Sequence, residues 1–173
     1  MKELIKKSKY LTKLLRHEPE DLEIDKNGWV KTKDVIRKLT LSFQDLEKIV
    51  ETDDKNRFSF DIHKKRIRAN QGHSIDVDVE LKEIVPPDIL YHGTSSKYID
   101  SIYKTGLEKR KRNHVHLSKD IETAEKVGKR HGGNLIILEI DSKKMYEEGV
   151  KFFISENKVY LVEKVEKKYL KII

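Results

Sequence analysis

The sequence predicts an α+β protein built from two lobes. Residues 1–75 contain three segments in which apolar residues have helical spacing, followed by two segments that alternate apolar and polar residues. The stretch 76–87 is acidic and ends in two prolines, which is typical of a connection. From residue 88 to 173, short apolar runs typical of strands are interspersed with helical segments. We therefore expect an N-terminal lobe over 1–75, a linker over 76–87 and a C-terminal lobe over 88–173.

The first lobe begins with three expected helices. Leu4 to Leu15 places its apolar residues on one helical face, and Pro19 should end that helix. Thr32 is the expected N-cap of a helix that runs to Leu39, and Ser42 is the expected N-cap of a helix that runs to Val50.

A β-hairpin is expected to follow these helices. Asn27-Gly28 signals a turn before a short extended piece at Trp29-Val30. Residues 57–62 and 66–69 alternate apolar and polar side chains around a turn at 63–65. Three helices followed by a hairpin are typical of a winged helix, whose usual function is nucleic-acid binding.

The composition favours a polyanionic partner. The 173 residues carry 37 Lys and Arg against 30 Asp and Glu, a formal net charge of +7, and basic side chains bind phosphates with release of counterions. There is no cysteine, so disulfides and thiolate metal sites are excluded. The apolar runs, such as 135–138, are too short to span a bilayer, and the charged start lacks a signal-peptide core. We expect a cytoplasmic monomer that does not contact membranes.

Two polar motifs of the first lobe could bind phosphate. Arg16-His17 lies at the expected end of the first helix, where the alternative is compensation of the helix dipole. Alternation sends Arg66 and Arg68 to the same face of a strand. The segment Gln71-Gly-His73-Ser74 follows, and two guanidinium groups beside it would form a phosphate pocket. The alternative is a solvated basic hairpin that touches only backbone phosphates.

The second lobe is expected to mix short strands and helices around a central split antiparallel sheet. The expected elements, in order, are a strand at Leu90-Tyr91, a helix over 97–103, a strand over 115–117, a helix over 121–130, and strands over 135–140, 152–154 and 159–162.

This lobe carries a motif pair suited to a dinucleotide. His92-Gly93-Thr94 is expected to form a tight glycine turn after a strand, and His116-Leu117-Ser118 lies on another strand downstream of Arg112. At this spacing the pair is the NAD-pocket signature of ADP-ribosyltransferase-like folds. A Rossmann site is not supported, because no Gly-x-Gly-x-x-Gly precedes a helix, and no cluster of residues indicates a metal.

Taken together, the motifs resemble the RNA 2′-phosphotransferase family over nearly the whole chain. The residues that carry the resemblance are Leu14-Leu-Arg-His-Glu-Pro19, Gly28-Trp-Val30, Arg66-Ile-Arg-Ala-Asn-Gln-Gly-His-Ser74, Tyr91-His-Gly-Thr94, His114-Val-His-Leu-Ser118 and Gly128-Lys-Arg130. Eukaryotic members act in tRNA splicing. The chain departs from the family near its C-terminus, where Ser155-Glu-Asn-Lys-Val-Tyr160 stands in place of a Ser-x-Asn-Gly-Val-Trp type run.

The resemblance implies specific roles for residues. The family's essential Arg-His-Arg-Arg set corresponds to Arg16, His17, Arg68 and Arg130, although Arg66 remains an alternative for the third position. The implied phosphate-binding residues are Arg66, Gln71, His73 and Ser74. The implied NAD-binding residues are His92, Gly93, Thr94, Arg112, His116, Leu117, Ser118 and Val159. We expect the residues of the two lobes to meet in a cleft.

The resemblance also implies a two-step reaction without a metal. An internal RNA 2′-phosphate attacks C1″ of NAD and expels nicotinamide, giving an ADP-ribosylated RNA 2′-phosphate. The ribose 2″-hydroxyl, oriented or deprotonated by His17, then attacks the phosphorus, while the arginines offset the growing negative charge. The products are 2′-OH RNA and ADP-ribose 1″–2″ cyclic phosphate.

Two other functions remain open at this stage. An ADP-ribosyltransferase that modifies nucleic acid or protein would stop after the first step and use the same NAD motifs. A non-catalytic winged-helix protein would explain residues 1–75 and the charge, but it would leave the second lobe's motifs without a role.

Overall fold

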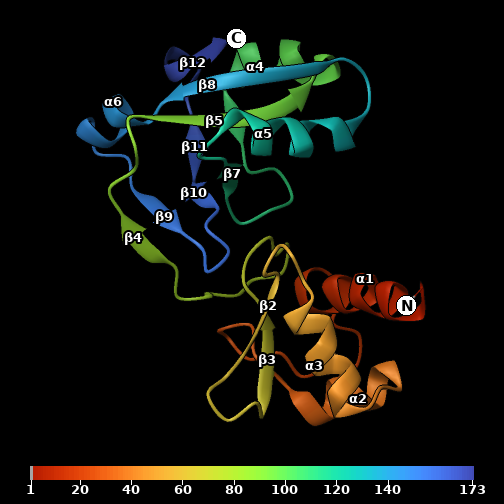
Figure 1. Ribbon diagram of the computed structural model, residues 1–173. Helices are drawn as coiled ribbons and strands as arrows, with labels where there is room; N and C mark the ends of the chain where they lie inside the picture. Colours follow the sequence, from red (N-terminus) through yellow and green to blue (C-terminus); the bar gives the residue numbers. More distant parts are fainter. Residues whose placement is uncertain (1) are drawn as a thin grey trace. The chain divides into compact units, whose positions relative to one another are not determined.

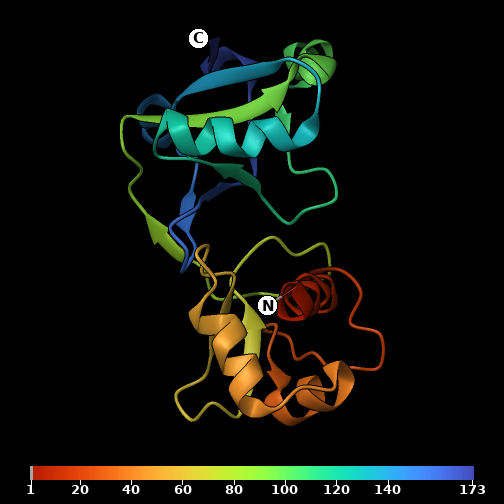
Figure 2. The ribbon, with the colours of Figure 1, turned by 45° about the vertical axis from the view of Figure 1, so that its right-hand side comes forward.

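The computed structural model describes residues 2–173, which form two compact units that divide after Glu80. Both units contain helices and antiparallel strands, so the predicted α+β class is confirmed (Figures 1 and 2). The division falls within the stretch expected to be a linker. In that stretch Val79 is buried with unit 1, and Lys82–Ile84 forms a strand of unit 2.

Unit 1 contains three helices and a three-stranded antiparallel sheet of order β1-β3-β2. Its elements are α1 (Lys2–Arg16), β1 (Val30–Lys31), α2 (Thr32–Leu39), α3 (Phe43–Glu51), β2 (Phe58–Phe60) and β3 (Arg66–Ala69). The expected hairpin is confirmed, because Phe58 pairs with Ala69 and Phe60 pairs with Ile67.

The apolar face of α1 forms the centre of unit 1. Leu11, Leu14 and Leu15 are fully buried, in one cluster with Val35 of α2 and Ile67 of β3. Burial of each such side chain contributes about 1.5–3 kcal/mol. The helical spacing found in the sequence therefore corresponds to the face that holds the three helices and the hairpin together.

The two predicted N-caps have different outcomes. Ser42 caps α3 as expected, since its hydroxyl accepts from the backbone N–H of Asp45 in a capping box. The prediction for Thr32 is wrong by one residue: Lys31 is the N-cap of α2 and makes no side-chain cap hydrogen bond. The Thr32 hydroxyl instead donates to the carbonyl of Lys64 at 2.9 Å, which ties the start of α2 to the hairpin turn.

Unit 2 contains two larger antiparallel sheets of orders β12-β8-β5 and β4-β9-β10-β7, with a small sheet of β6 and β11. Its helices are η1 (Ser96–Tyr98), α4 (Ile99–Thr105), α5 (Ile121–Gly128), η2 (Lys129–His131), α6 (Ser142–Glu147) and η3 (Lys167–Tyr169). Its strands are β4 (Lys82–Ile84), β5 (Ile89–Ser95), β6 (Leu107–Glu108), β7 (Val115–Leu117), β8 (Leu135–Asp141), β9 (Phe152–Ile154), β10 (Tyr160–Val162), β11 (Lys164–Val165) and β12 (Leu170–Ile172). Backbone hydrogen bonds between Tyr91 and Ser118 join the two larger sheets.

The expected glycine turn at His92-Gly93-Thr94 is wrong. Strand β5 continues through these residues, and Gly93 pairs with Ile137 of β8. Glycine is required there by packing, because a Cβ on Gly93 would lie 1.7 Å from the carbonyl oxygen of Ala124 in α5. A Cβ on Gly128 would in turn lie 2.9 Å from the carbonyl carbon of Gly93. Helix α5, drawn in teal, lies alongside β5 in both views (Figures 1 and 2).

The expected helix over 121–130 is divided in the structure. The α-helix ends at Gly128, and residues 129–131 form the 3-10 turn η2. Among the described residues, no helix has the length and apolar character needed to cross a bilayer.

We predict that Gly93→Ala destabilises the protein by at least about 3 kcal/mol, because the new methyl group would overlap backbone atoms of α5. Gly149→Ala is the matched control. Gly149 has a φ of +94° and open space around its Cβ position, so its replacement has only the conformational cost of about 1 kcal/mol. Urea unfolding of both variants measures the difference, and an equal loss in the two would contradict the packing role of Gly93.

Candidate active site

The C-terminus of α1 and the segment after β3 are joined in unit 1. The backbone N–H of Ser74 donates to the carbonyl of Arg16 at 2.8 Å, and the Ser74 hydroxyl lies 2.9 Å from Nδ1 of His17. The Arg16 side chain is buried, while His17 is exposed. Residues predicted from two distant motifs therefore lie side by side at the end of one helix.

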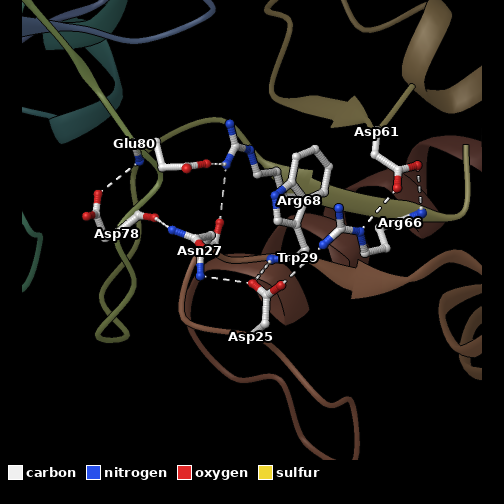
Figure 3. A network of polar contacts seen from close by, with 8 residues as sticks. All are labelled: Asp25, Asn27, Trp29, Asp61, Arg66, Arg68, Asp78 and Glu80. Carbon is white, nitrogen blue, oxygen red and sulfur yellow. Dashed lines mark hydrogen bonds and ion pairs between the residues drawn. The ribbon is translucent and has the colours of Figure 1, made fainter. Parts of the chain in front are cut away.

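Arg66 and Arg68 share a face of β3, as alternation predicts. Both guanidinium groups lie against the ring of Trp29, with their Cζ atoms 5.3 and 4.4 Å from its centroid (Figure 3). Stacking of this kind is a cation–π interaction that contributes about 0.5–2 kcal/mol.

Arg66 and Arg68 differ in the carboxylates that their guanidinium groups contact. Nε of Arg66 lies 3.1 Å from a carboxylate oxygen of Asp61, and its Nη1 lies 3.6 Å from Asp25 (Figure 3). The Arg68 side chain is only 12% exposed and, within the described part of the chain, has a single carboxylate contact, with the exposed Glu80 at 3.4 Å. Nε of Arg68 is buried and has no hydrogen-bond partner within residues 2–173. Arg68 is therefore better prepared than Arg66 to bind an additional anion.

His73 lies among these cations. It is 2% exposed, and burial, followed by the positive charges of Arg16, His17 and Arg68, lowers its pKa to about 4. Arg16, His17 and Arg68 are thus the groups whose charge acts on this one buried imidazole, which is neutral at physiological pH. We call Arg16, His17 and Arg68, together with His73, the cationic cluster.

The cationic cluster and the neighbouring Gln71 contain buried polar atoms without partners among residues 2–173. Across residues 2–173, Nε2 of His73, Oε1 of Gln71 and Nε of Arg68 are buried and make no hydrogen bond. Each such atom costs about 1–3 kcal/mol unless something else satisfies it. A phosphate would supply acceptor oxygens to Nε of Arg68, and to Nε2 of His73 in the tautomer that carries its proton there, and the two arginines would offset its charge.

Unit 2 contains a cavity of about 510 Å³, a size typical of sites for small molecules. We call it the unit 2 cavity. Its lining includes the predicted NAD-binding residues His92, Thr94, Arg112 and His116. It also includes residues that sequence reasoning did not select, namely Tyr98, His114, His131 and the basic segment 109–111. The run of four basic residues at 109–112 was a signal that could have indicated this segment.

His92 is held as a hydrogen-bond acceptor for a ligand. Its Nδ1 lies 2.9 Å from the backbone carbonyl of His116, which can only accept, so this nitrogen carries the proton. Burial is the main factor that lowers the pKa of His92, and the nearby His131 lowers it further, whereas the His116 carbonyl raises it. The imidazole is therefore neutral at physiological pH, with the lone pair on Nε2.

The remaining predicted NAD-binding residues do not line the unit 2 cavity. Gly93 packs under α5, Leu117 is buried in the core, and Ser118 pairs through its backbone with Tyr91. The backbone N–H of Val159 is engaged within the fold, because it donates to the Ser155 hydroxyl at 3.1 Å.

Arg130 lies in η2 and is exposed, one residue before the cavity-lining His131. Its expected meeting with Arg16, His17 and Arg68 in a cleft stays a prediction. The described residues contain no group of three or more His, Cys, Asp or Glu side chains that could hold a metal ion.

Comparison with known proteins identifies the family of the chain. The profile of the RNA 2′-phosphotransferase, Tpt1 / KptA family matches residues 2–164. A protein of Fusobacterium nucleatum named probable RNA 2′-phosphotransferase is 51% identical, over 96% of this chain and 97% of the relative. Relatives with the same name from Nostoc punctiforme and Hahella chejuensis are 48% and 45% identical, over 96% and 99% of this chain and 96% of each relative. The matched region includes the cationic cluster and the unit 2 cavity.

We predict that His73 makes the stability of the protein depend on pH. Because its pKa is about 4 in the folded chain against the ordinary 6.5, the unfolded chain binds the proton more readily between these values. The free energy of unfolding should therefore fall by about 2 kcal/mol from about pH 7 to about pH 5 on account of this one group. In His73→Gln that part of the pH dependence should disappear.

The matched control is His63→Gln, in the exposed hairpin turn, which should keep the wild-type difference between the two pH values. Urea unfolding at both pH values provides the measurement. A His73→Gln variant with the same pH dependence as the parent would contradict the buried, neutral state of His73.

Proposed function

The chain belongs to the RNA 2′-phosphotransferase family, and from this premise we propose that it removes an internal RNA 2′-phosphate in two steps that consume NAD. Membership makes the protein a transferase with an RNA substrate. The cationic cluster carries the proposal for the phosphate, because Nε of Arg68 and Nε2 of His73 are buried without a hydrogen-bond partner among residues 2–173. The unit 2 cavity supports the proposal for NAD.

In the first proposed step, a 2′-phosphate oxygen attacks C1″ of the nicotinamide ribose. The new C1″–O bond forms as the bond to the nicotinamide nitrogen breaks, and nicotinamide leaves with the bonding electrons. Arg16 and Arg68 hold the phosphate, with Gln71, His73 and Ser74 beside it, while Arg66 stays engaged by Asp25 and Asp61. The product is RNA with an ADP-ribosylated 2′-phosphate.

In the second proposed step, the ribose 2″-hydroxyl attacks the phosphorus. The bond from phosphorus to the RNA 2′-oxygen breaks, and that oxygen takes a proton to give 2′-OH RNA and ADP-ribose 1″–2″ cyclic phosphate. His17 orients or deprotonates the 2″-hydroxyl, and its contact with the Ser74 hydroxyl supports this role by fixing the ring. Arg130 stabilises the charge that grows on the phosphate.

The proposed NAD site uses the polar lining of the unit 2 cavity. The neutral His92 has an acceptor nitrogen that suits a ribose hydroxyl, and the buried Thr94 offers its hydroxyl to the nicotinamide amide. The basic segment 109–112 suits the pyrophosphate. Gly93 supports the site indirectly by letting α5 pack on β5, and no metal takes part.

We also infer the two fold families expected from the sequence. The order α1-β1-α2-α3-β2-β3 with β3 central supports a winged helix for unit 1. Two antiparallel sheets joined through Tyr91 and Ser118 support the split sheet of an ADP-ribosyltransferase-like unit 2.

The first test is the dependence on NAD. An RNA with one internal 2′-phosphate is incubated with the protein, with and without NAD, and the RNA is followed on a gel while nicotinamide is measured. We expect 2′-OH RNA only with NAD, and one nicotinamide for each phosphate removed. Phosphate removal without NAD would overturn the proposal. ADP-ribosylated RNA as the stable end product would instead establish a transferase that stops after the first step.

The second test compares the two arginines of β3. Arg68→Ala should lower kcat/KM about a hundredfold, the typical loss when one charged donor to a developing oxyanion is removed. Arg66→Ala should lower it by less than about tenfold, because two carboxylates already engage that side chain. The two variants are a matched pair on one strand, beside one tryptophan. A larger loss in Arg66→Ala would reverse the assignment.

A further inference from the structure

Unit 1 has a second basic site at the hairpin turn. A groove of about 440 Å³ lies between the start of α2, the first residue of α3 and the turn between β2 and β3. It is lined by Lys31, Thr32, Lys33, Ile36, Phe43, Lys64 and Lys65. We call it the lysine groove. Its lining holds four ammonium groups and no carboxylate.

The fold brings these lysines together from two distant segments. The backbone N–H of Thr32 donates to the carbonyl of Lys65 at 2.8 Å, and the Thr32 hydroxyl donates to the carbonyl of Lys64. Thr32 is buried, so both hydrogen bonds are shielded from water. Thr32, the first residue of α2, thus holds the backbone of Lys64 and Lys65 next to Lys31 and Lys33.

Much of this positive charge is not neutralised within the chain. Lys31 lies 3.8 Å from the exposed Glu23, and Lys64 forms an ion pair with Glu47. Lys33 and Lys65 are exposed and make no ion pair with any residue from 2 to 173. Four like charges around one groove repel one another, and a polyanion relieves that repulsion with release of counterions.

The apolar side chains that line the lysine groove favour binding of a nucleic-acid strand over binding of a small inorganic anion. Ile36 and Phe43 are half-buried and line the groove, and the Phe43 ring packs against Phe60 with centroids 6.0 Å apart. An aromatic surface beside ammonium groups is typical of sites where single-stranded nucleic acid binds, because bases stack while phosphates are neutralised.

We propose that the lysine groove binds the phosphodiester backbone of single-stranded RNA at a distance from the reacting 2′-phosphate. The proposal rests on the proposed function, in which Arg68 holds that phosphate. Lys64 lies in the turn before β3, four residues before Arg68, so the two Cα atoms are at most about 14 Å apart. Because phosphates of a stacked strand are about 3.4 Å apart along its axis, the groove lies within roughly four nucleotides of the reacting one.

The test compares two variants with the same change of charge. The groove variant replaces Lys31, Lys33, Lys64 and Lys65 with Ala, and the control replaces the exposed Lys143, Lys144, Lys151 and Lys171 of unit 2. Fluorescence anisotropy measures binding of a single-stranded RNA of about 12 nucleotides that lacks a 2′-phosphate, without NAD, over a range of salt concentrations.

We expect the groove variant to bind this RNA at least about tenfold more weakly than the control at low salt. The slope of log affinity against log salt should decrease by about 2–3, at roughly 0.7 for each phosphate that the variant no longer neutralises. Charge reversals Lys33→Glu and Lys65→Glu give the same test with side chains that make no ion pair in the described chain, so folding is preserved. Equal weakening in the groove and control variants would overturn the proposal.

A turnover experiment separates this proposal from the proposed function. A trinucleotide with an internal 2′-phosphate has only two backbone phosphates for the groove lysines to bind, so the groove variant should process it with unchanged kcat and little change in KM. On the longer phosphorylated RNA only KM should rise. A loss of kcat on the trinucleotide would overturn the proposal for the groove. If no protein processes either RNA, the proposed function fails, while the binding comparison still decides whether the groove binds RNA.

Discussion

Concentrating positive charge around a buried imidazole is the constraint on which unit 1 depends. Arg16 and Arg68 repel one another, and a protonated His73 would add a further charge beside them. Burial keeps that imidazole neutral, and Ser74 holds the ends of two chain segments together through Arg16 and His17. The fold tolerates this arrangement because the helices and the hairpin share a large apolar core, which outweighs the cost of a few polar atoms left without partners.

The carboxylates near Trp29 determine whether Arg66 or Arg68 has a guanidinium group available to bind another anion. Asp25 and Asp61 engage Arg66, while Asp25 also accepts from two backbone N–H groups in the turn before Trp29. Arg68 stacks on the same ring but has only the exposed Glu80 as a carboxylate contact in the described chain. A phosphate can displace an exposed carboxylate contact at little cost, because such surface pairs contribute about 0–1 kcal/mol. Two arginines of one strand can thus have a structural and a substrate-binding role.

Unit 2 depends on a close contact between backbones rather than on charge. Helix α5 approaches β5 at Gly93 and Gly128, where no Cβ fits. This contact fixes the strand that carries His92 and Thr94 on the cavity wall. The glycine and its two neighbours therefore have different positions in the structure, since Gly93 packs against α5 while His92 and Thr94 line the cavity. Some of the groups that would contact substrate lie on strands, Arg68 on β3 and His92 and Thr94 on β5, which limits the reorganisation needed on binding.

The local sequence pattern was sufficient to predict most helices and strands and the types of residue at the candidate sites. This is because periodicity, prolines and capping residues influence the structure of only a few neighbouring residues. It correctly located α1, the Ser42 cap and the hairpin, and it selected Arg16, His17, Arg68, His92 and His116 as candidates. Contacts between distant segments decided the rest. Gly93, expected in a turn, lies in a strand against which α5 packs. The Thr32 hydroxyl, expected to cap α2, donates a hydrogen bond to the carbonyl of Lys64 instead. Two carboxylates contact Arg66, and neither of them contacts Arg68. The spacing of residues in the sequence does not predict these three contacts, because each depends on which atoms the completed fold brings within a few ångströms of one another.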